Sequence, residues 1–162
     1  MKLFVLVNVA IFLCSTSFAQ KSANYLKIHS GAEVPVDGVV GEDYKTGWGI
    51  HATDYFEVHK GGSILLTTGF TSWKTRKDWE SSKANLLIVR LGYRIFAVEG
   101  LYFQIDPAGV VFWFNSASYT YAGGIGYLFN KKTGRGFDIS SKFSNSTGGS
   151  WISLNLGYQF KL

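Results

Sequence analysis

Three histidines are the side chains most able to carry acid–base or nucleophilic chemistry in this chain: His29, His51 and His59. A hydrolase or acyltransferase needs a nucleophile, a base and an orienting acid within hydrogen-bond reach of one another. His51 and Glu57 fall on the same face of one extended segment, but their separation along it is about 20 Å at ~3.3 Å per residue. We therefore expect no dyad between them.

The other candidate groupings are equally sparse. His29 and Ser30 are adjacent, so in a strand their side chains point to opposite faces. We predict no catalytic residue, and interpret His29 and His51 as interior hydrogen-bonding groups and His59 as a turn residue. The histidines lack transition-metal spacing, and the glycines of "GGIGY" open no helix that could cradle a phosphate. We expect no metal and no cofactor.

The elements that position these residues are strands. Apolar and polar residues alternate with a period of two between turn signals, and no stretch keeps a helical period for three turns. This predicts one all-β domain of eight antiparallel strands, arranged as a sandwich or as a closed up-and-down barrel. The predicted strands span 24–34, 47–58, 63–74, 84–95, 100–114, 118–129, 136–144 and 150–162.

The ionisable residues of these strands fall on one side of the predicted sheet. Placing the more apolar parity of each strand on one face leaves five cations and four carboxylates on the other: Lys27, Glu33, Glu57, Arg90, Arg94, Asp106, Asp138, Lys142 and Lys161. A narrow interior needs such a balance, because removing one partner of a buried ion pair costs about 3–5 kcal/mol. We predict a charge network in the lumen of a barrel; surface charges on a soluble sheet are the alternative.

Aromatic residues gather near the ends of the predicted strands. A repeated Gly-Tyr pair places three tyrosines at one rim: Tyr93, Tyr127 and Tyr158. Tryptophans lie toward the other rim: Trp48, Trp73, Trp113 and Trp151. Trp73 and Trp151 have the inward parity, so we assign Trp48 and Trp113 to the second belt. Two aromatic belts around an apolar band are typical of a membrane barrel.

The apolar face is continuous enough to need a covering. Facing water, such a band would promote aggregation, whereas lipid requires it and barrel closure removes the sheet edges. Asp54 is the exception, because its parity places a carboxylate on this face. Either a bulge shifts the register around Thr53, or Asp54 lies near the interface.

The first 19 residues read as a signal peptide. Lys2 precedes an apolar run from Leu3 to Leu13 that is shorter than the ~20 residues of a spanning helix, and small residues precede Gln20. We expect residues 1–19 to be removed and residues 20–162 to form the barrel domain, which then contains no cysteine. Lipidation at Cys14 is the alternative.

The charge of the chain excludes one class of partner and suggests another. The formal net charge is +5, and the basic residues are mixed with acids along the chain, which does not fit nucleic-acid binding. Residues 74–84 contain the basic stretch "KTRKDWESSK" with an aromatic residue in it. Positive charge beside an aromatic ring suits lipopolysaccharide phosphates or an extracellular macromolecule. A solvated loop is the alternative.

Three phrases carry a family resemblance: "LIVRLGYRI", "GLYFQIDPAG" and "AGGIGYLF". With them the chain resembles the small eight-stranded outer-membrane β-barrels of the OmpA/OmpX type, and is similar to the outer-membrane β-barrel domain proteins of Bacteroidetes-like bacteria, over essentially all of its mature length. The resemblance implies an eight-stranded antiparallel up-and-down transmembrane β-barrel in a bacterial outer membrane, present as a monomer among lipid and lipopolysaccharide.

The same resemblance gives the last strand a role. In such barrels the final strand pairs with the first and is recognised by the barrel-assembly machinery, which implies an assembly signal at Tyr158, Phe160 and Leu162. This signal commonly ends on an aromatic residue, whereas this chain ends on leucine.

The sequence therefore favours a structural or surface-interaction role without catalysis. Side chains just fill the interior of an eight-stranded barrel, so we expect no open pore. One alternative is a lipid A-modifying enzyme, although the compact His-x-Ser arrangement of the outer-membrane lipid A deacylases is absent. The other is a soluble periplasmic β-barrel that binds a small hydrophobic ligand.

Overall fold

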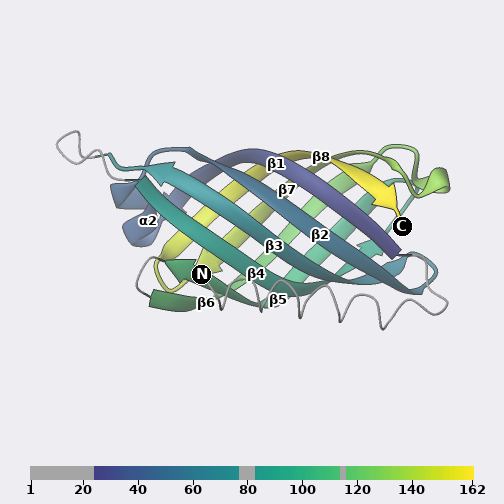
Figure 1. Ribbon diagram of the computed structural model, residues 1–162, viewed down its shortest axis with the longest axis horizontal. Coiled ribbons are helices and arrows are strands. Elements are labelled where there is room, and N and C mark those ends of the chain that lie inside the picture. The colour runs from purple at the N-terminus through teal and green to yellow at the C-terminus, as the bar shows by residue number, and fades with distance from the viewer. Residues whose placement is uncertain (1–23, 77–82, 114–115) are drawn as a thin grey trace.

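Eight antiparallel strands close into one barrel in the computed structural model, which describes residues 24–76, 83–113 and 116–162 (Figure 1). Each strand pairs with its neighbours in sequence, and the last pairs with the first. The strands are β1 (Asn24–Asp37), β2 (Gly47–His59), β3 (Gly62–Lys74), β4 (Lys83–Phe96), β5 (Leu101–Trp113), β6 (Ser116–Leu128), β7 (Gly136–Ser146) and β8 (Gly149–Lys161). The predicted fold class is confirmed, with every strand end within three residues of its expected place.

Two short helices were not expected. The helix α2 (Gly38–Asp43) follows β1 where the sequence indicated only a turn, and a 3-10 turn, η1 (Lys131–Thr133), precedes β7. Asp37 caps α2 by accepting a hydrogen bond from the Gly38 N–H at 2.6 Å. Six residues are too few to show a helical period. Among the described residues, no helix is long and apolar enough to cross a bilayer.

The barrel has two different ends, at opposite extremes of its long axis (Figure 1). We call the end that carries Asn24 and the last residues of β8 the terminal rim, and the end that carries α2 the distal rim. Odd-numbered strands run from the terminal rim to the distal rim, and even-numbered strands run back.

Burial alternates along each strand in the sense opposite to that of a soluble protein. On β8, Ile152, Leu154 and Leu156 are exposed, whereas Ser153 and Asn155 are buried. Large apolar side chains are likewise exposed on all the remaining strands, while polar side chains of the opposite parity are buried. The outer surface is therefore an apolar band, and closure leaves the sheet no unpaired edge.

The exception on that outer face lies in regular strand. Thr53 and Asp54 pair in unbroken register with β1 and β3, where Asp54 stands between Leu26 and Leu66. The suggestion of a bulge around Thr53 is therefore wrong, because β2 shifts its register only farther along, between Glu57 and His59. Asp54 is a half-buried carboxylate on the outer face.

A bulge does occur in β5. The register shifts between Asp106 and Gly109, around Pro107, which has no N–H to donate to a ladder. The Tyr119 hydroxyl on β6 donates a hydrogen bond to the Pro107 carbonyl. In an apolar surrounding an unpaired carbonyl is costly, so this contact stabilises the irregular point.

Candidate functional site

Seven of the nine predicted lumen charges are buried inside the barrel. They are Lys27, Glu33, Arg90, Arg94, Asp106, Asp138 and Lys142. Glu57 is half-buried toward the terminal rim. Lys161 is exposed, and its assignment to the lumen is wrong, because it is the last residue of β8 and its side chain reaches solvent at the rim.

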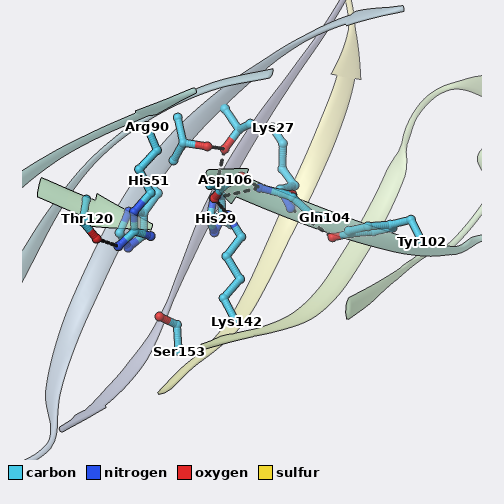
Figure 2. Close-up of polar contacts among 12 residues, drawn as sticks. Lys27, His29, His51, Arg90, Tyr102, Gln104, Asp106, Thr120, Lys142 and Ser153 are labelled. Atoms are coloured by element: carbon cyan, nitrogen blue, oxygen red, sulfur yellow. Dashed lines mark hydrogen bonds and ion pairs between the residues drawn. The ribbon is translucent and has the colours of Figure 1, made fainter. Parts of the chain in front are cut away.

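Two ion pairs cross the lumen. Lys27 Nζ on β1 lies 3.0 Å from Asp138 Oδ1 on β7, and both side chains are fully buried. The Tyr102 hydroxyl donates to the same carboxylate at 2.8 Å from Oδ2. Lys142 Nζ lies 3.2 Å from Asp106 Oδ2, and Gln104 Nε2 donates to Asp106 at 2.9 Å. Figure 2 shows Lys142 and Gln104 converging on Asp106 from different strands.

Arg94 is held mainly by aromatic rings. Its guanidinium carbon lies 3.6 Å from the ring centre of Tyr55 and 5.3 Å from that of Tyr102, and Nη1 donates to Gln159 Oε1 at 2.8 Å. A cation–π contact between a desolvated guanidinium and an aromatic face contributes about 2 kcal/mol of stabilisation. Rings thus supply part of the stabilisation that a carboxylate supplies elsewhere in the lumen.

A third polar group was missed by the sequence analysis. His51 Nε2 lies 3.0 Å from Glu33 Oε1, and the Ser153 hydroxyl donates to Glu33 Oε2 at 2.6 Å. His51 and Glu57 lie too far apart along β2 to pair, whereas the partner of His51 is Glu33 on the neighbouring strand β1. The useful signal was the shared inward parity of Glu33 and His51.

The order of this group matters for chemistry. A base activates a serine when histidine lies between the serine and the acid. Here the carboxylate of Glu33 lies between Ser153 and His51, so the serine hydroxyl donates its hydrogen bond to the carboxylate and not to the histidine. His29 stacks on His51, with ring centres 5.1 Å apart, and its Nε2 lies 3.3 Å from the Thr53 hydroxyl. These contacts connect side chains of β1, β2 and β8 and make the interior of the barrel more rigid.

The distal end of the lumen is apolar. Seven buried residues, here called the apolar plug, pack together there: Val40, Trp73, Ala84, Leu86, Ile88, Val111 and Trp151. Trp73 and Trp151 meet edge to face, with ring centres 5.5 Å apart. Val40 of α2 covers the plug, and its N–H donates to the Gly148 carbonyl at 3.1 Å. The helix therefore closes this end of the barrel.

Arg90 marks the boundary between the charged lumen and the apolar plug. Its Nη2 donates to the Thr120 hydroxyl at 3.2 Å, as Figure 2 shows, and its guanidinium carbon lies 5.4 Å from the Trp151 ring centre. The inward parity of Trp73 and Trp151 thus places them in the plug.

The distal belt differs from the expected one. Trp48 is half-exposed on the outer face of β2. Trp113 is partly buried and packs against the apolar plug, 6.1 Å from Trp73 between ring centres. Its assignment to the outer belt is wrong, because the register shift between Asp106 and Gly109 changes which residues of β5 face outward. Beyond the shift Phe112 is exposed and Val111 is buried, so Trp113 has the inward parity of Val111.

The outer face of the terminal rim carries more aromatic residues than the tyrosines that were expected. Tyr127 is 41% exposed, and Tyr158 lies between Phe137 and Phe160, 5.3 and 4.8 Å from their ring centres. Tyr93 is hydrogen-bonded to His59, which ends β2. The belt was underestimated because phenylalanine has no sequence repeat comparable to Gly-Tyr.

The last strand closes the barrel. Tyr158 faces Ile28 and Phe160 faces Leu26 across the β1–β8 seam. The Leu162 N–H donates to the Asn24 carbonyl at 2.9 Å. Phe160 and Leu162 are both exposed.

No metal site is formed by the residues that the structure describes: no three of their His, Cys, Asp or Glu side chains are placed to hold an ion.

Solved structures share this architecture. The outer membrane protein Ail of Yersinia pestis in a phospholipid nanodisc superposes with a TM-score of 0.60 at 14% identity, over 88% of this chain and 100% of that one. A crystal structure of Ail gives 0.51 at 19% identity, over 87% and 100%. Neisserial surface protein A, NspA, gives 0.54 at 10% identity, over 88% and 100%.

At sequence level there is no comparable similarity: no family model and no curated protein matches this chain. The structural matches cover nearly all described strands, while the identities are too low to carry a binding activity across. The chain has the fold of the small eight-stranded outer-membrane β-barrels.

Proposed function

We propose that this chain is an integral protein of a bacterial outer membrane, with a structural or surface-interaction role and no catalytic activity. One observation carries the proposal: the outer surface is apolar on all eight strands, while ion pairs such as Lys27 with Asp138 lie fully buried inside. In water that distribution is costly in both places. In a bilayer the apolar band contacts acyl chains, and the buried charges pair with one another inside the barrel.

The aromatic residues support a defined depth in the bilayer. Tyr127, Phe137, Tyr158 and Phe160 ring one side of the terminal rim, and Trp48 lies on the outer face toward the distal rim. Aromatic rings favour the two lipid–water interfaces. They would hold the barrel against vertical displacement.

A sealed lumen fits this role better than a channel. The apolar plug and the Val40 contact of α2 occupy the distal end, and crossing side-chain pairs occupy the middle. An eight-stranded barrel has room for side chains and little else. We infer that the protein does not conduct ions at rest.

The distal rim is the candidate interaction surface. It carries the two longest connections between strands, residues 38–46 and 75–82, and outer-membrane barrels have short periplasmic turns and longer external loops. Ail is named an attachment invasion locus protein and NspA a surface protein. By this analogy we propose that residues 74–84 contact lipopolysaccharide or an extracellular macromolecule; residues 77–82 lie outside the described residues.

Export and assembly complete the proposal. Residues 1–19 would act as the signal peptide; they lie outside the described residues. The exposed end of β8, with Tyr158, Phe160 and Leu162, would be recognised by the barrel-assembly machinery before the seam with β1 closes. The folded chain would then be a monomer, because closure leaves no strand edge for a second copy.

Expression in a Gram-negative host tests the proposal. The protein should fractionate with outer membranes, and its unheated sample should migrate faster on a detergent gel than the boiled one, because a folded barrel stays compact. Recovery in the soluble periplasmic fraction would contradict membrane insertion and favour the ligand-binding alternative.

The absence of catalysis has its own test. Lipid A from cells with and without the protein should give the same mass spectrum, and His51→Ala should change nothing. A modified lipid A that disappears in the His51→Ala variant would favour the enzyme instead.

A further inference from the structure

Two lysines face each other across neighbouring strands at the distal rim. Lys74, the last residue of β3, pairs directly with Lys83, the first residue of β4. Both are exposed, and both point outward because Trp73 and Ala84 beside them point into the plug. Directly opposed residues have Cα atoms about 4.5–5.5 Å apart, and like charges in such positions destabilise a sheet. An anion between them would reverse that effect.

The outward residues that pair across β2, β3 and β4 form rows, and these rows become more apolar with distance from the distal rim. The next outward row across β2, β3 and β4 is Trp48, Ser72 and Asn85. The row after it, farther from the rim, is Ile50, Phe70 and Leu87. Moving toward the distal rim, the outer face therefore presents apolar side chains, then an indole with a hydroxyl and an amide, then two ammonium groups.

Neighbouring backbone contacts bring further cations to the pair. The Lys45 N–H donates to the Lys74 carbonyl at 2.8 Å, and the Arg76 N–H donates to the Asp43 carbonyl at 2.7 Å. Arg76 also donates from Nε to the Tyr44 carbonyl. Among the described residues these contacts bring Lys45 and Arg76 near the lysine pair, beside the acids Glu42 and Asp43, so cations outnumber acids there by four to two.

We propose that these three rows bind the phosphorylated head group of lipid A. Its phosphate would lie between Lys74 and Lys83, its sugar hydroxyls would meet Ser72 and Asn85, and an acyl chain would follow Phe70 and Leu87. This inference rests on the proposed membrane location and names one lipid for the distal rim.

The graded rows favour a lipid over a soluble anion. A free phosphate would use only the lysines, whereas the apolar row continues directly beneath them into the band that faces lipid. The opposed lysines also favour a phosphate monoester, which carries nearly two negative charges, over the single charge of a phosphodiester. Phosphatidylglycerol is therefore the weaker fit.

Native mass spectrometry of the folded full chain in nanodiscs tests the site. Neutral phospholipid discs would be doped with diphosphoryl lipid A, with dephosphorylated lipid A, or with phosphatidylglycerol. The wild type should retain diphosphoryl lipid A about tenfold better than either of the others. The variant K74Q/K83Q should lose that preference. The matched control K60Q/K161Q removes two exposed lysines at the terminal rim and should keep it.

A stability measurement makes the outcome independent of lipid retention. In neutral lipid, K74Q/K83Q should unfold at higher urea concentration than the wild type, because it lacks the repulsion. Adding diphosphoryl lipid A should raise the urea midpoint of the wild type and leave that of the variant unchanged.

Equal retention of diphosphoryl lipid A by the wild type and K74Q/K83Q, or equal preference for phosphatidylglycerol, would overturn the inference while leaving membrane insertion intact. A chain without the fast-migrating folded band in any lipid would overturn insertion as well.

Discussion

The two halves of the lumen reach a filled interior by opposite means. The distal half uses the apolar plug, where Trp73 and Trp151 pack edge to face beneath α2. The rest uses charges that cross the barrel, such as Lys27 with Asp138 and Lys142 with Asp106. When an apolar side chain loses a packing partner, a cavity is left in the core. When a buried charge loses its partner, it remains buried without compensation.

Asp138→Ala breaks the charged half most severely. It strands the Lys27 ammonium and removes the acceptor of the Tyr102 hydroxyl, so the free energy of unfolding should fall by about 3–5 kcal/mol. Urea unfolding in lipid vesicles, followed by tryptophan fluorescence, measures the change.

The double variant Lys27→Met with Asp138→Leu is the companion experiment. Replacing a buried ion pair by apolar side chains of similar size is often neutral or stabilising, so most of the loss should be recovered. A double variant as unstable as Asp138→Ala would show that the lumen needs the pair itself.

Trp151→Ala breaks the other half. A cavity in the plug should cost roughly 3 kcal/mol, and the stacking surface of Arg90 is lost with it. The plug is also the proposed seal, so planar bilayers should record ion conductance for this variant and none for Asp138→Ala. The half-exposed Trp48→Ala serves as the control and should leave the bilayer closed.

Glu33→Gln should have a smaller effect. The amide keeps the shape but weakens the contacts of His51 and Ser153, at about 1–2 kcal/mol for a charge-assisted hydrogen bond. The same urea titration measures it, and Ser153→Ala provides the partial loss for comparison. No change in either variant would mean that water replaces these contacts.

Tyr119→Phe is the smallest change. It removes the hydroxyl that satisfies the Pro107 carbonyl on the outer face, and we expect about 1 kcal/mol of destabilisation in lipid. Tyr121→Phe, on the same face of β6, is the matched control and should be neutral. Equal effects would argue against a specific role for the bulge.

Much of the fold was predictable because alternation is a local property. The period of two defined each strand to within three residues, and seven of the nine charges that it assigned to the lumen are buried. Lys161 was misassigned because it ends β8, where its side chain reaches solvent, and Trp113 because the bulge at Pro107 reverses the inward parity of β5 beyond it.

The six residues of α2 are too few for a period, and the helix is stabilised by a hydrogen bond from Val40 to Gly148, in the turn between β7 and β8. The group of Glu33, His51 and Ser153 was missed for a related reason. Its members come from three strands, and Ser153 on β8 lies 120 residues from Glu33 on β1.

By itself the sequence determined which face most strand residues take, because successive side chains of an unbroken strand point in opposite directions whatever the strand pairs with. Only the tertiary structure decided which residues meet. Partners such as Lys27 and Asp138, or the opposed Lys74 and Lys83, depend on register and on closure of β8 against β1. The register of each strand pair depends on the lengths of the turns and on the bulges, and the alternation of apolar and polar residues does not indicate either.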